Sequence, residues 1–385
     1  MRLRSSTRTA SRVALERLRS AAVTRSTPRV VVAMPSYEGG PHVRAAVGSL
    51  LAQTEGDLRV VAVDDCSRDG TADVLRELAA ADSRLEVHLN VSRLGMLRNT
   101  NRALALARER CPGAEFVALG SDHDVWDPRW LAALTAALDV APSAVLAYPL
   151  TERIGADGTP VRDRPRPWRC DTSGIESPWR RCWHAYRCMV AGDMIYGLVR
   201  APALGAVGGG YRPVLVPDRL LLAELALHGE FVQVDAVLWR RRFTGLAELD
   251  RQRRAFWPDG DAPAYTRLPW WLVHAGTAAW ELAVLGPAGT RLRGAAFALL
   301  LLAAGARLRV VRRLQRLRVH VGARLEAPTR AALRRSARFR RAVQARRLPV
   351  PSDTSTVLER LLESLEDGAS AEDQPKTAEP RPPRR

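Results

Sequence analysis

The chain has 385 residues, of which 46% are hydrophobic, and its formal net charge is +18. This hydrophobic content is ordinary for a globular protein and is enough for a sizeable core. Arginine supplies nearly all of the positive charge, because Lys376 is the only lysine. Such a charge favours anionic partners, namely nucleic acid, an acidic lipid surface or a phosphorylated substrate. No run reaches the ~18 continuous apolar residues of a membrane-spanning helix, so the sequence predicts none.

The cysteines form an odd set without a C-x-x-C pair, which excludes the usual spacing of a structural metal site. They are Cys66, Cys111, Cys170, Cys182 and Cys188. This pattern favours reduced thiols in a cytosolic protein, with a disulfide framework as the alternative.

Regular structure is expected from residue 29 onward. Residues 1–28 are rich in Arg, Ser and Thr with Glu16 as the only acid, which is typical of a transit peptide and equally of a disordered or surface-helical leader. Strands are then predicted at 29–35, 58–65, 84–89 and 115–120, and helices at 41–53, 71–80, 96–110 and 126–138. This alternation predicts an α/β fold with a doubly wound, mainly parallel, Rossmann-like sheet. Such sheets bind ligands outside the carboxyl ends of their strands.

The pattern is less regular after residue 147. Residues 150–190 are expected to be mainly loops. Order is predicted again at 194–200, in a helix around 217–230 and in a strand at 231–242.

The last third of the chain is strongly basic. Residues 291–347 hold seventeen arginines against one acid, Glu326. A basic amphipathic helix is predicted at 308–321, which either lies on an anionic membrane surface or packs on the rest of the chain with solvated arginines. Nucleic acid is the least favoured partner, because no recognised nucleic-acid motif accompanies the arginines. Residues 351–385 are expected to be largely disordered.

Carboxylates cluster directly after the strand predicted at 115–120. A charge that loses solvation costs several kcal/mol unless a partner compensates it, and Mg²⁺ or Mn²⁺ suits carboxylate oxygens. Asp122 and Asp124, as a D-x-D pair, can hold such a metal and through it a diphosphate. The alternative is a simple helix start, and this is the role expected of Asp127 before Pro128. His123 is expected only to orient the loop.

A second acid pair, Asp64 and Asp65, follows the neighbouring strand at 58–65. A carboxylate at this edge can accept a hydrogen bond from a nucleobase N–H or a ribose hydroxyl. Asp69 and Thr71 are explained by turn and capping chemistry, which does not account for two adjacent acids before the turn.

Four segments, in this order and spacing, resemble motifs of the family 2 glycosyltransferases. MPSYEGGPHVRAAVGSLLAQT resembles the P-x-Y-N opening and its helix, and VDDCSRDGT resembles V-D-D-G-S-x-D-G-T. LGMLRNTNRALALA resembles the family's A-R-N segment, and SDHDVWDPRWLAAL resembles its D-x-D metal motif. The resemblance covers about residues 29–138 and continues more weakly to 242. It implies a GT-A fold, a nucleotide-diphospho-sugar donor, a divalent metal and inversion at the anomeric carbon.

The resemblance also implies roles for individual residues. Asp65 would face the nucleobase with support from Asp64, and Asp122 and Asp124 would serve the diphosphate and the metal. The nucleotide would also be flanked by Pro35, Tyr37, Glu38, Arg98 and Asn101. Three positions depart from the family pattern, with Glu38 where Asn is usual and Cys66 and Ala103 where Gly is usual. Glu38 therefore leaves the identity of the nucleotide open.

Inverting transfer needs a base that accepts the proton of the acceptor hydroxyl. The family carries this acid at a loop-to-helix junction in the second half, and Asp218 in VLVPDRLLLAELALHGEF has that setting. Its alternative is an ordinary helix-start acid. Glu224 is expected to be structural, and nothing in the sequence assigns a role to Asp193. The family's processive synthases carry Q-x-x-R-W, whereas WRRRF stands here, which argues against a polymerising, membrane-spanning synthase.

The sequence therefore predicts a metal-dependent inverting glycosyltransferase, in the cytoplasm or on the inner face of the cell membrane. Its acceptor would be a saccharide or glycolipid of cell-surface synthesis. The alternatives are a sugar-phosphate nucleotidyltransferase and a non-catalytic, basic membrane-associated protein that retains the fold. The predicted division is a leader (1–28), a GT-A domain (29–250, with its nucleotide half at 29–140), a helical basic extension (251–350) and a tail (351–385).

Overall fold

The computed structural model describes residues 27–161, 169–242, 249–280, 298–299 and 301–303. These residues all lie in one compact unit, Met1–Val310. None of the helices in these ranges has the length and apolar character needed to cross a membrane. The predictions for the leader, for the helix at 308–321 and for the tail lie outside the described residues.

The first half of the sheet confirms the predicted strands and their parallel order. Its strands are β1 (Val30–Ser36), β2 (Leu58–Asp64), β3 (Leu85–Leu89) and β4 (Phe116–Leu119). β1 pairs in parallel with both β2 and β4, and β2 pairs in parallel with β3. The carboxyl ends of β1, β2 and β4 therefore meet at one edge, as the sequence predicts.

Helices cover both faces of this sheet. They are η1 (Gly40–His42), α2 (Val43–Leu51), α3 (Thr71–Ala81), α4 (Met96–Arg110) and α5 (Trp130–Val140). Val30, Val32 and Met34 share a buried cluster with α2, α3 and α5, whereas Val31 and Ala33 share one with α4 and with helices of the second half. The continuous apolar run of β1 follows from this two-sided burial.

The second half extends the sheet to eight strands, in the order β3-β2-β1-β4-β7-β6-β8-β5. The added strands are β5 (Val125–Trp126), β6 (Ala144–Ile154), β7 (Leu198–Arg200) and β8 (Glu230–Arg242). β6 and β8 are parallel, while β7 and β5 pair antiparallel with their neighbours. The sheet is mixed but mostly parallel, so the predicted α/β class is confirmed.

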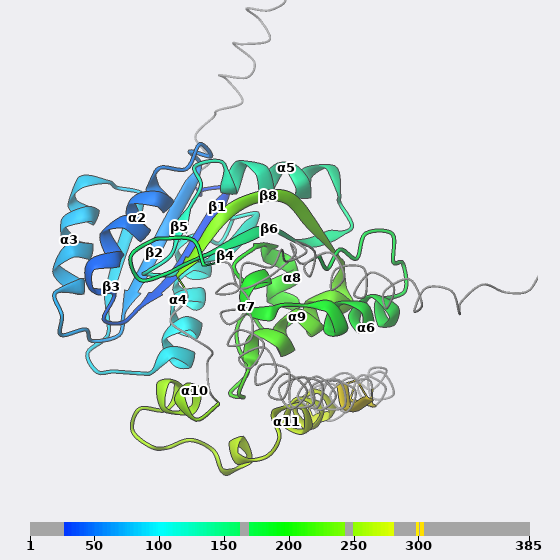
Figure 1. Cartoon of the computed structure of the whole chain (residues 1–385). Coiled ribbons are helices and arrows are strands. Elements are labelled where there is room, and N and C mark those ends of the chain that lie inside the picture. The colour runs from blue at the N-terminus through cyan, green and yellow to red at the C-terminus, as the bar shows by residue number, and fades with distance from the viewer. Residues whose placement is uncertain (1–26, 162–168, 243–248, 281–297, 300, 304–385) are drawn as a thin grey trace, which may run out of the picture. The chain divides into compact units, whose positions relative to one another are not determined.

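β8 runs along β6 and ends beside β5 (Figure 1). The pairing of β6 with β8 shifts register around Leu150, and such irregularities bend a strand pair. At the far end of β8, Arg240 pairs with Val125 and Trp239 with Trp126. The arginines that end β8 are thus brought to the loop that carries Asp122 and Asp124.

The remaining helices follow the second-half strands. They are α6 (Pro178–Cys188), α7 (Ala191–Met194), α8 (Ala201–Ala206), α9 (Pro217–His228), α10 (Leu249–Phe256), η2 (Ala264–Arg267) and α11 (Trp270–Ala279). The expectation that 150–190 is mainly loop is wrong at α6, which begins after the Ser177 cap and Pro178. The helix buries Arg181, whose guanidinium donates to the carbonyls of Ala226 and Ile175 at 2.7 and 2.8 Å. A buried arginine breaks the apolar pattern by which sequence analysis recognises such a helix.

Asp127 does not cap α5 as predicted. The helix begins at Trp130 with Arg129 as its N-cap, because Trp126 belongs to β5. The Asp127 carboxylate instead accepts the backbone N–H of Arg129 at 2.9 Å and pairs with the Arg129 side chain. Asp127 therefore shapes the turn between β5 and α5.

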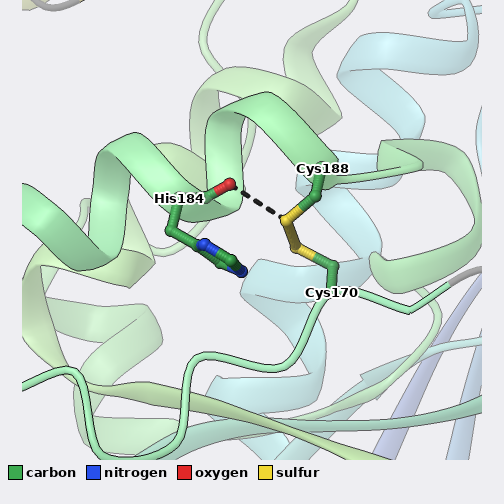
Figure 2. A group of neighbouring side chains, drawn as sticks. All are labelled: Cys170, His184 and Cys188. Carbon is green, nitrogen blue, oxygen red and sulfur yellow. Dashed lines mark hydrogen bonds between the residues drawn. A yellow bond between two sulfur atoms is a disulfide. The ribbon is translucent and has the colours of Figure 1, made fainter. Parts of the chain in front are cut away.

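Two of the cysteines form a disulfide, which corrects the expectation of reduced thiols. Cys170 is bonded to Cys188, the last residue of α6 (Figure 2), with a Cα–Cα distance of 5.5 Å. Cys170 is held for this contact by its carbonyl, which accepts the Tyr148 hydroxyl at 2.5 Å. Cys66, Cys111 and Cys182 are free thiols. The pairing depends on tertiary contacts, so the spacing of 18 residues gave no sign of it.

Replacing both Cys170 and Cys188 by serine should lower the free energy of unfolding by about 3 kcal/mol, because the closed loop no longer restricts the unfolded chain. Chemical denaturation without reductant measures the difference, with Cys66→Ser as the control. The wild-type protein in excess dithiothreitol should match the double variant. Equal stability of the oxidised wild-type protein and the double variant would contradict the disulfide.

Candidate active site

Loops next to the predicted site residues contain unusual backbone conformations. Three non-glycine residues among the described ranges have positive φ, namely Glu38 at 50°, Cys66 at 63° and Val216 at 55°. Each lies within two residues of a predicted site residue. Such conformations are costly for residues with a side chain, and they persist only where the surroundings enforce them.

Asp122 ties the end of β4 to the end of β1. One carboxylate oxygen accepts the Ser36 hydroxyl and the Tyr37 N–H, both at 2.9 Å, and the other lies 2.7 Å from His123 Nδ1. The residue is only 7% exposed. A Cβ on Gly39 would lie 3.3 Å from Asp122 Oδ2, so the loop approaches closely because this residue is glycine.

Asp124 is more deeply buried, with 2% exposure. Its Oδ1 accepts the Arg242 backbone N–H at 2.7 Å. Burial raises the pKa of Asp124, although the nearby His123 and the Arg242 N–H counteract part of the rise. The Arg242 guanidinium is itself bound to the carbonyls of His123 and Gly155, both at 2.9 Å, so it fastens the loop around the two acids.

His123 bridges the two acids, as expected of a residue that orients this loop. Its Nε2 lies 3.9 Å from Asp124 Oδ1, in addition to the contact with Asp122. Burial lowers the pKa of His123, but the hydrogen bond with Asp122 and the charges of both acids outweigh this and raise it overall. In its protonated form, the ring compensates part of the buried negative charge.

The two acids suit a metal that takes its other ligands from phosphate and water. Mg²⁺ is commonly held by one or two carboxylates together with substrate phosphates, and the burial of Asp124 leaves negative charge for a cation to offset. Among the described residues, the one group of three or more ligands close enough to hold a metal by itself is Cys170, His184 and Cys188 (Figure 2). Its two sulfurs are bonded to each other and are not free to coordinate.

Asp64 and Asp65 hold the loops beside this pair. Asp65 is 1% exposed and accepts hydrogen bonds from Asn90 Nδ2 and the N–H groups of Leu94 and Gly95, at 2.7, 2.7 and 2.8 Å. Asp64 accepts from the N–H and hydroxyl of Ser67 at 3.0 and 2.5 Å. Both carboxylates thus shape the loops that border the site, and contact of Asp65 with a nucleobase stays a prediction.

Three other predicted residues follow the end of β1 into the same loop. Pro35 is half-buried in the strand opposite Val63. The Tyr37 ring lies under the guanidinium of Arg93, 4.0 Å from its centroid. Glu38 is exposed, and its N–H donates to Ser67 Oγ at 2.8 Å. Their role toward a nucleotide stays a prediction.

Arg98 and Asn101, both on α4, bind other parts of the chain. Arg98 forms an ion pair with Asp261. Asn101 accepts the Tyr211 N–H at 2.7 Å and donates to the Tyr211 carbonyl at 2.8 Å. Asn101 therefore holds the loop before α9. Contact of Arg98 or Asn101 with a nucleotide stays a prediction.

Asp218 lies in the first turn of α9. Its carboxylate accepts the Arg219 N–H at 2.9 Å. Burial raises the pKa of Asp218, and the positive charges of Arg219 and Arg241 offset only part of the rise. Burial raises the pKa of the Tyr196 phenol, and the charges of Asp124, Asp122 and Asp218 add to the rise while Arg241 opposes it. The predicted base and the D-x-D pair are thus within electrostatic reach of one side chain.

Several site residues were not identified from the sequence. Arg241 forms a 2.6 Å ion pair with Asp193, which is 6% exposed, and Tyr196 stacks on Trp239 at a centroid distance of 4.8 Å. The basic run at the end of β8 was the available signal for Arg241, but nothing local indicated its partner. Glu224 instead lies 3.6 Å from Arg212 Nε.

Comparison with known proteins finds a family match for the first part of the chain. Residues 31–186 match the model of glycosyl transferase family 2. A Bacillus subtilis glycosyltransferase assigned to teichuronic acid biosynthesis, TuaG, is 33% identical over 99 residues, which are 26% of this chain and 37% of that protein. The chain therefore spans little more than a third of this relative's length.

Two solved structures have similar chains at low identity. Residues 1–349 of S. aureus TarS, in complex with UDP-GlcNAc, are 17% identical with a TM-score of 0.46, over 65% of this chain and 66% of that one. A mannosyltransferase from Pyrobaculum calidifontis, in complex with GDP-Man and Mn²⁺, is 17% identical with a TM-score of 0.43, over 73% of this chain and 86% of that one. Residues 31–186 match glycosyl transferase family 2, and this match and the α/β sheet together confirm the resemblance read from the motifs and the GT-A type of fold.

Proposed function

We propose that this protein is a glycosyltransferase that moves one sugar from a nucleotide-diphospho-sugar to an acceptor hydroxyl, with inversion at the anomeric carbon. The observation that carries the proposal is that Asp122 and Asp124 are buried together at the end of β4, where Ser36, Tyr37 and the Arg242 N–H fix their carboxylates. Inverting transfer needs carboxylates in two separate roles at one place. One pair would hold a cation that neutralises charge on the leaving diphosphate, and another carboxylate would accept the acceptor's proton.

Asp122 and Asp124 would hold a divalent cation, Mg²⁺ or Mn²⁺. When bound, the cation neutralises the charge that develops on the departing diphosphate. The chain's own contribution is orientation, because Ser36, Tyr37 and the Arg242 N–H fix the direction of both carboxylates before any ligand arrives.

Asp218 would accept the proton of the acceptor hydroxyl. The hydroxyl oxygen would form the new bond to the anomeric carbon as the nucleoside diphosphate leaves. Burial suits this role, because it raises the pKa of the carboxylate and makes it a better proton acceptor.

The nucleotide would lie along the loops that follow β1 and β2, beside Pro35, Tyr37, Glu38, Asp64, Asp65, Arg98 and Asn101. UDP-GlcNAc and GDP-Man are ligands of the two compared proteins, and for this chain they define donors to test. The acceptor would be a saccharide or glycolipid of cell-surface synthesis, which agrees with the pathway named for the B. subtilis relative.

Donor binding should require a metal. Calorimetry with a panel of nucleotide sugars should detect binding with Mn²⁺ or Mg²⁺ and lose it in EDTA, because Asp122 and Asp124 would otherwise repel the diphosphate. Asp124→Asn should weaken the metal-dependent binding. The matched control is Asp127→Asn, an acid of the same segment that serves the turn to α5. Donor affinity that is unchanged in EDTA would refute the metal assignment.

Asp218→Asn should abolish transfer while leaving donor affinity and folding nearly unchanged. The substitution keeps the size of the side chain but removes the proton acceptor, whose assistance is typically worth about 10²–10⁴-fold in rate. Single-turnover transfer and calorimetry measure the two effects. A helix cap would survive the change, since Asn caps a helix about as well as Asp, so near-normal turnover would exclude Asp218 as the base.

The pH profile provides the control for this assignment. Only the ionised carboxylate accepts a proton, so kcat should fall as the pH drops through the raised pKa of Asp218. The acidic limb should therefore lie above the ~3.9 of an ordinary aspartate. Residual activity of Asp218→Asn should lack this limb.

The basic segment 291–347 would attach the protein to an anionic membrane surface. Sedimentation with phosphatidylserine liposomes should fall when Arg312, Arg313, Arg316 and Arg318 are replaced by glutamine, and added salt should weaken binding through screening. The control carries the same charge change at the exposed Arg76, Arg102, Arg251 and Arg254. Equal sedimentation of the two variants would count against a membrane role for the segment.

A further inference from the structure

The chain that leads into Asp218 is held from outside by side chains of four other elements. It connects α8 to α9 and ends at Val216. The contacts are Asn101 of α4 with the Tyr211 backbone, Tyr265 of η2 with the Pro213 carbonyl at 2.9 Å, His274 of α11 with the Leu215 carbonyl at 2.8 Å, and Gln252 of α10 with the Val216 N–H at 2.9 Å. Three of these four residues follow position 250.

Val216 is the residue that most needs such support. Its backbone is in the left-handed region, with φ 55° and ψ 45°, where a β-branched residue is a true outlier. Pro217 and Asp218 follow directly, so the conformation of Val216 sets the direction in which α9 starts and Asp218 points. Gln252 and His274 bind the backbone on the two sides of this strained residue, at the Val216 N–H and the Leu215 carbonyl.

His274 is suited to a fixed contact. It is fully buried, and burial lowers its pKa to about 4, so the ring is neutral at physiological pH. A carbonyl oxygen only accepts, so Nε2 carries the proton and donates to Leu215. The ring also packs edge-on against Trp270 at a centroid distance of 5.0 Å. One tautomer in one orientation therefore holds the Leu215 carbonyl.

Gln252 is anchored through the end of its helix. Phe256 and Trp257 share a buried cluster with Leu97 of α4 and with Leu215. The approach is close, because a Cβ on Gly95 would lie 2.5 Å from the Phe256 carbonyl oxygen. Gly95 also donates its N–H to Asp65. The packing at the end of α10 thus supports both the Asp65 loop and the Val216 backbone.

We propose that Gln252 and His274 are positioning residues, which hold Val216 in its left-handed conformation and thereby aim Asp218 at the acceptor. Both lie beyond the segment 31–186 that matches the family, so the segment that follows the family domain completes its site. The proposal rests on the proposed function of Asp218 as the base. Neither residue would touch the donor, the acceptor or the metal.

The test compares variants that remove each contact with variants that keep it. Gln252→Leu removes the acceptor and Gln252→Glu retains one, while His274→Phe removes the donor and His274→Gln retains an amide N–H near the Nε2 position. Arg251→Leu, at an exposed position beside Gln252, is the matched control. Transfer kinetics give kcat, calorimetry gives donor Kd, and hydrogen–deuterium exchange follows the peptide that contains residues 211–219.

The contact-removing variants should lower kcat by about tenfold to a hundredfold, the range expected when a reacting group is misplaced by about 1 Å. Donor Kd should be unchanged, and exchange should increase only in residues 211–219. The contact-keeping variants and Arg251→Leu should resemble the wild-type protein. Gln252 is half-buried, so its variants disturb the core less than a change at His274. They test the proposal if His274→Phe fails to fold.

Three results would overturn the proposal. They are an unchanged kcat in Gln252→Leu, a loss of donor binding that parallels the loss of kcat, and unchanged exchange at 211–219. The exchange measurement needs no substrate, so it tests the hold on Val216 even where no donor in the panel is transferred. Failure of the proposed function is recognised separately, because Asp218→Asn would then be as active as the wild-type protein.

Discussion

One oxygen of the Asp122 carboxylate accepts hydrogen bonds from the Ser36 hydroxyl and the Tyr37 N–H, both at 2.9 Å and across more than 80 residues of sequence. This contact joins the ends of β1 and β4, which are already adjacent through their parallel pairing. It directs the loop after β4 so that Asp124 is buried beside it. The position of the proposed metal pair therefore depends on a structural hydrogen bond made by one of its own members.

The site buries several acids away from water within a strongly basic protein. The compensation comes mainly from backbone and neutral donors, and less from arginine side chains. Asp65 accepts hydrogen bonds from two backbone N–H groups and the Asn90 side-chain amide, and Asp124 accepts one from the N–H of Arg242. The Arg242 guanidinium binds carbonyl oxygens instead. Charge that is not compensated in this way would be available for the proposed cation and the proposed proton transfer.

The region around Asp218 depends on packing between distant parts of the chain. The strained Val216 lies between residues held by α10 and α11, and the buried pair of Asp193 with Arg241 joins α7 to the end of β8. The left-handed conformation of Val216 and the position of Asp218 thus depend on contacts from several parts of the unit. A catalytic acid can be placed accurately in this way, because bonds from several rigid elements determine its loop together.

Local pattern in the sequence was sufficient for the first half of the fold. The strand at 29–35, the helix at 96–110 and the acids after 58–65 and 115–120 could be predicted, because burial on two faces and turn chemistry leave their signature in neighbouring residues. Only the tertiary structure decided the rest. These features join residues that are 18 to 59 positions apart or use buried polar groups. They are the Cys170–Cys188 bond, the helix that buries Arg181, the pairing of Asp193 with Arg241, and the contacts of Gln252 and His274 with the Val216 loop. Such contacts are selected by shape and by unsatisfied hydrogen-bonding groups in the folded chain, which no local pattern records.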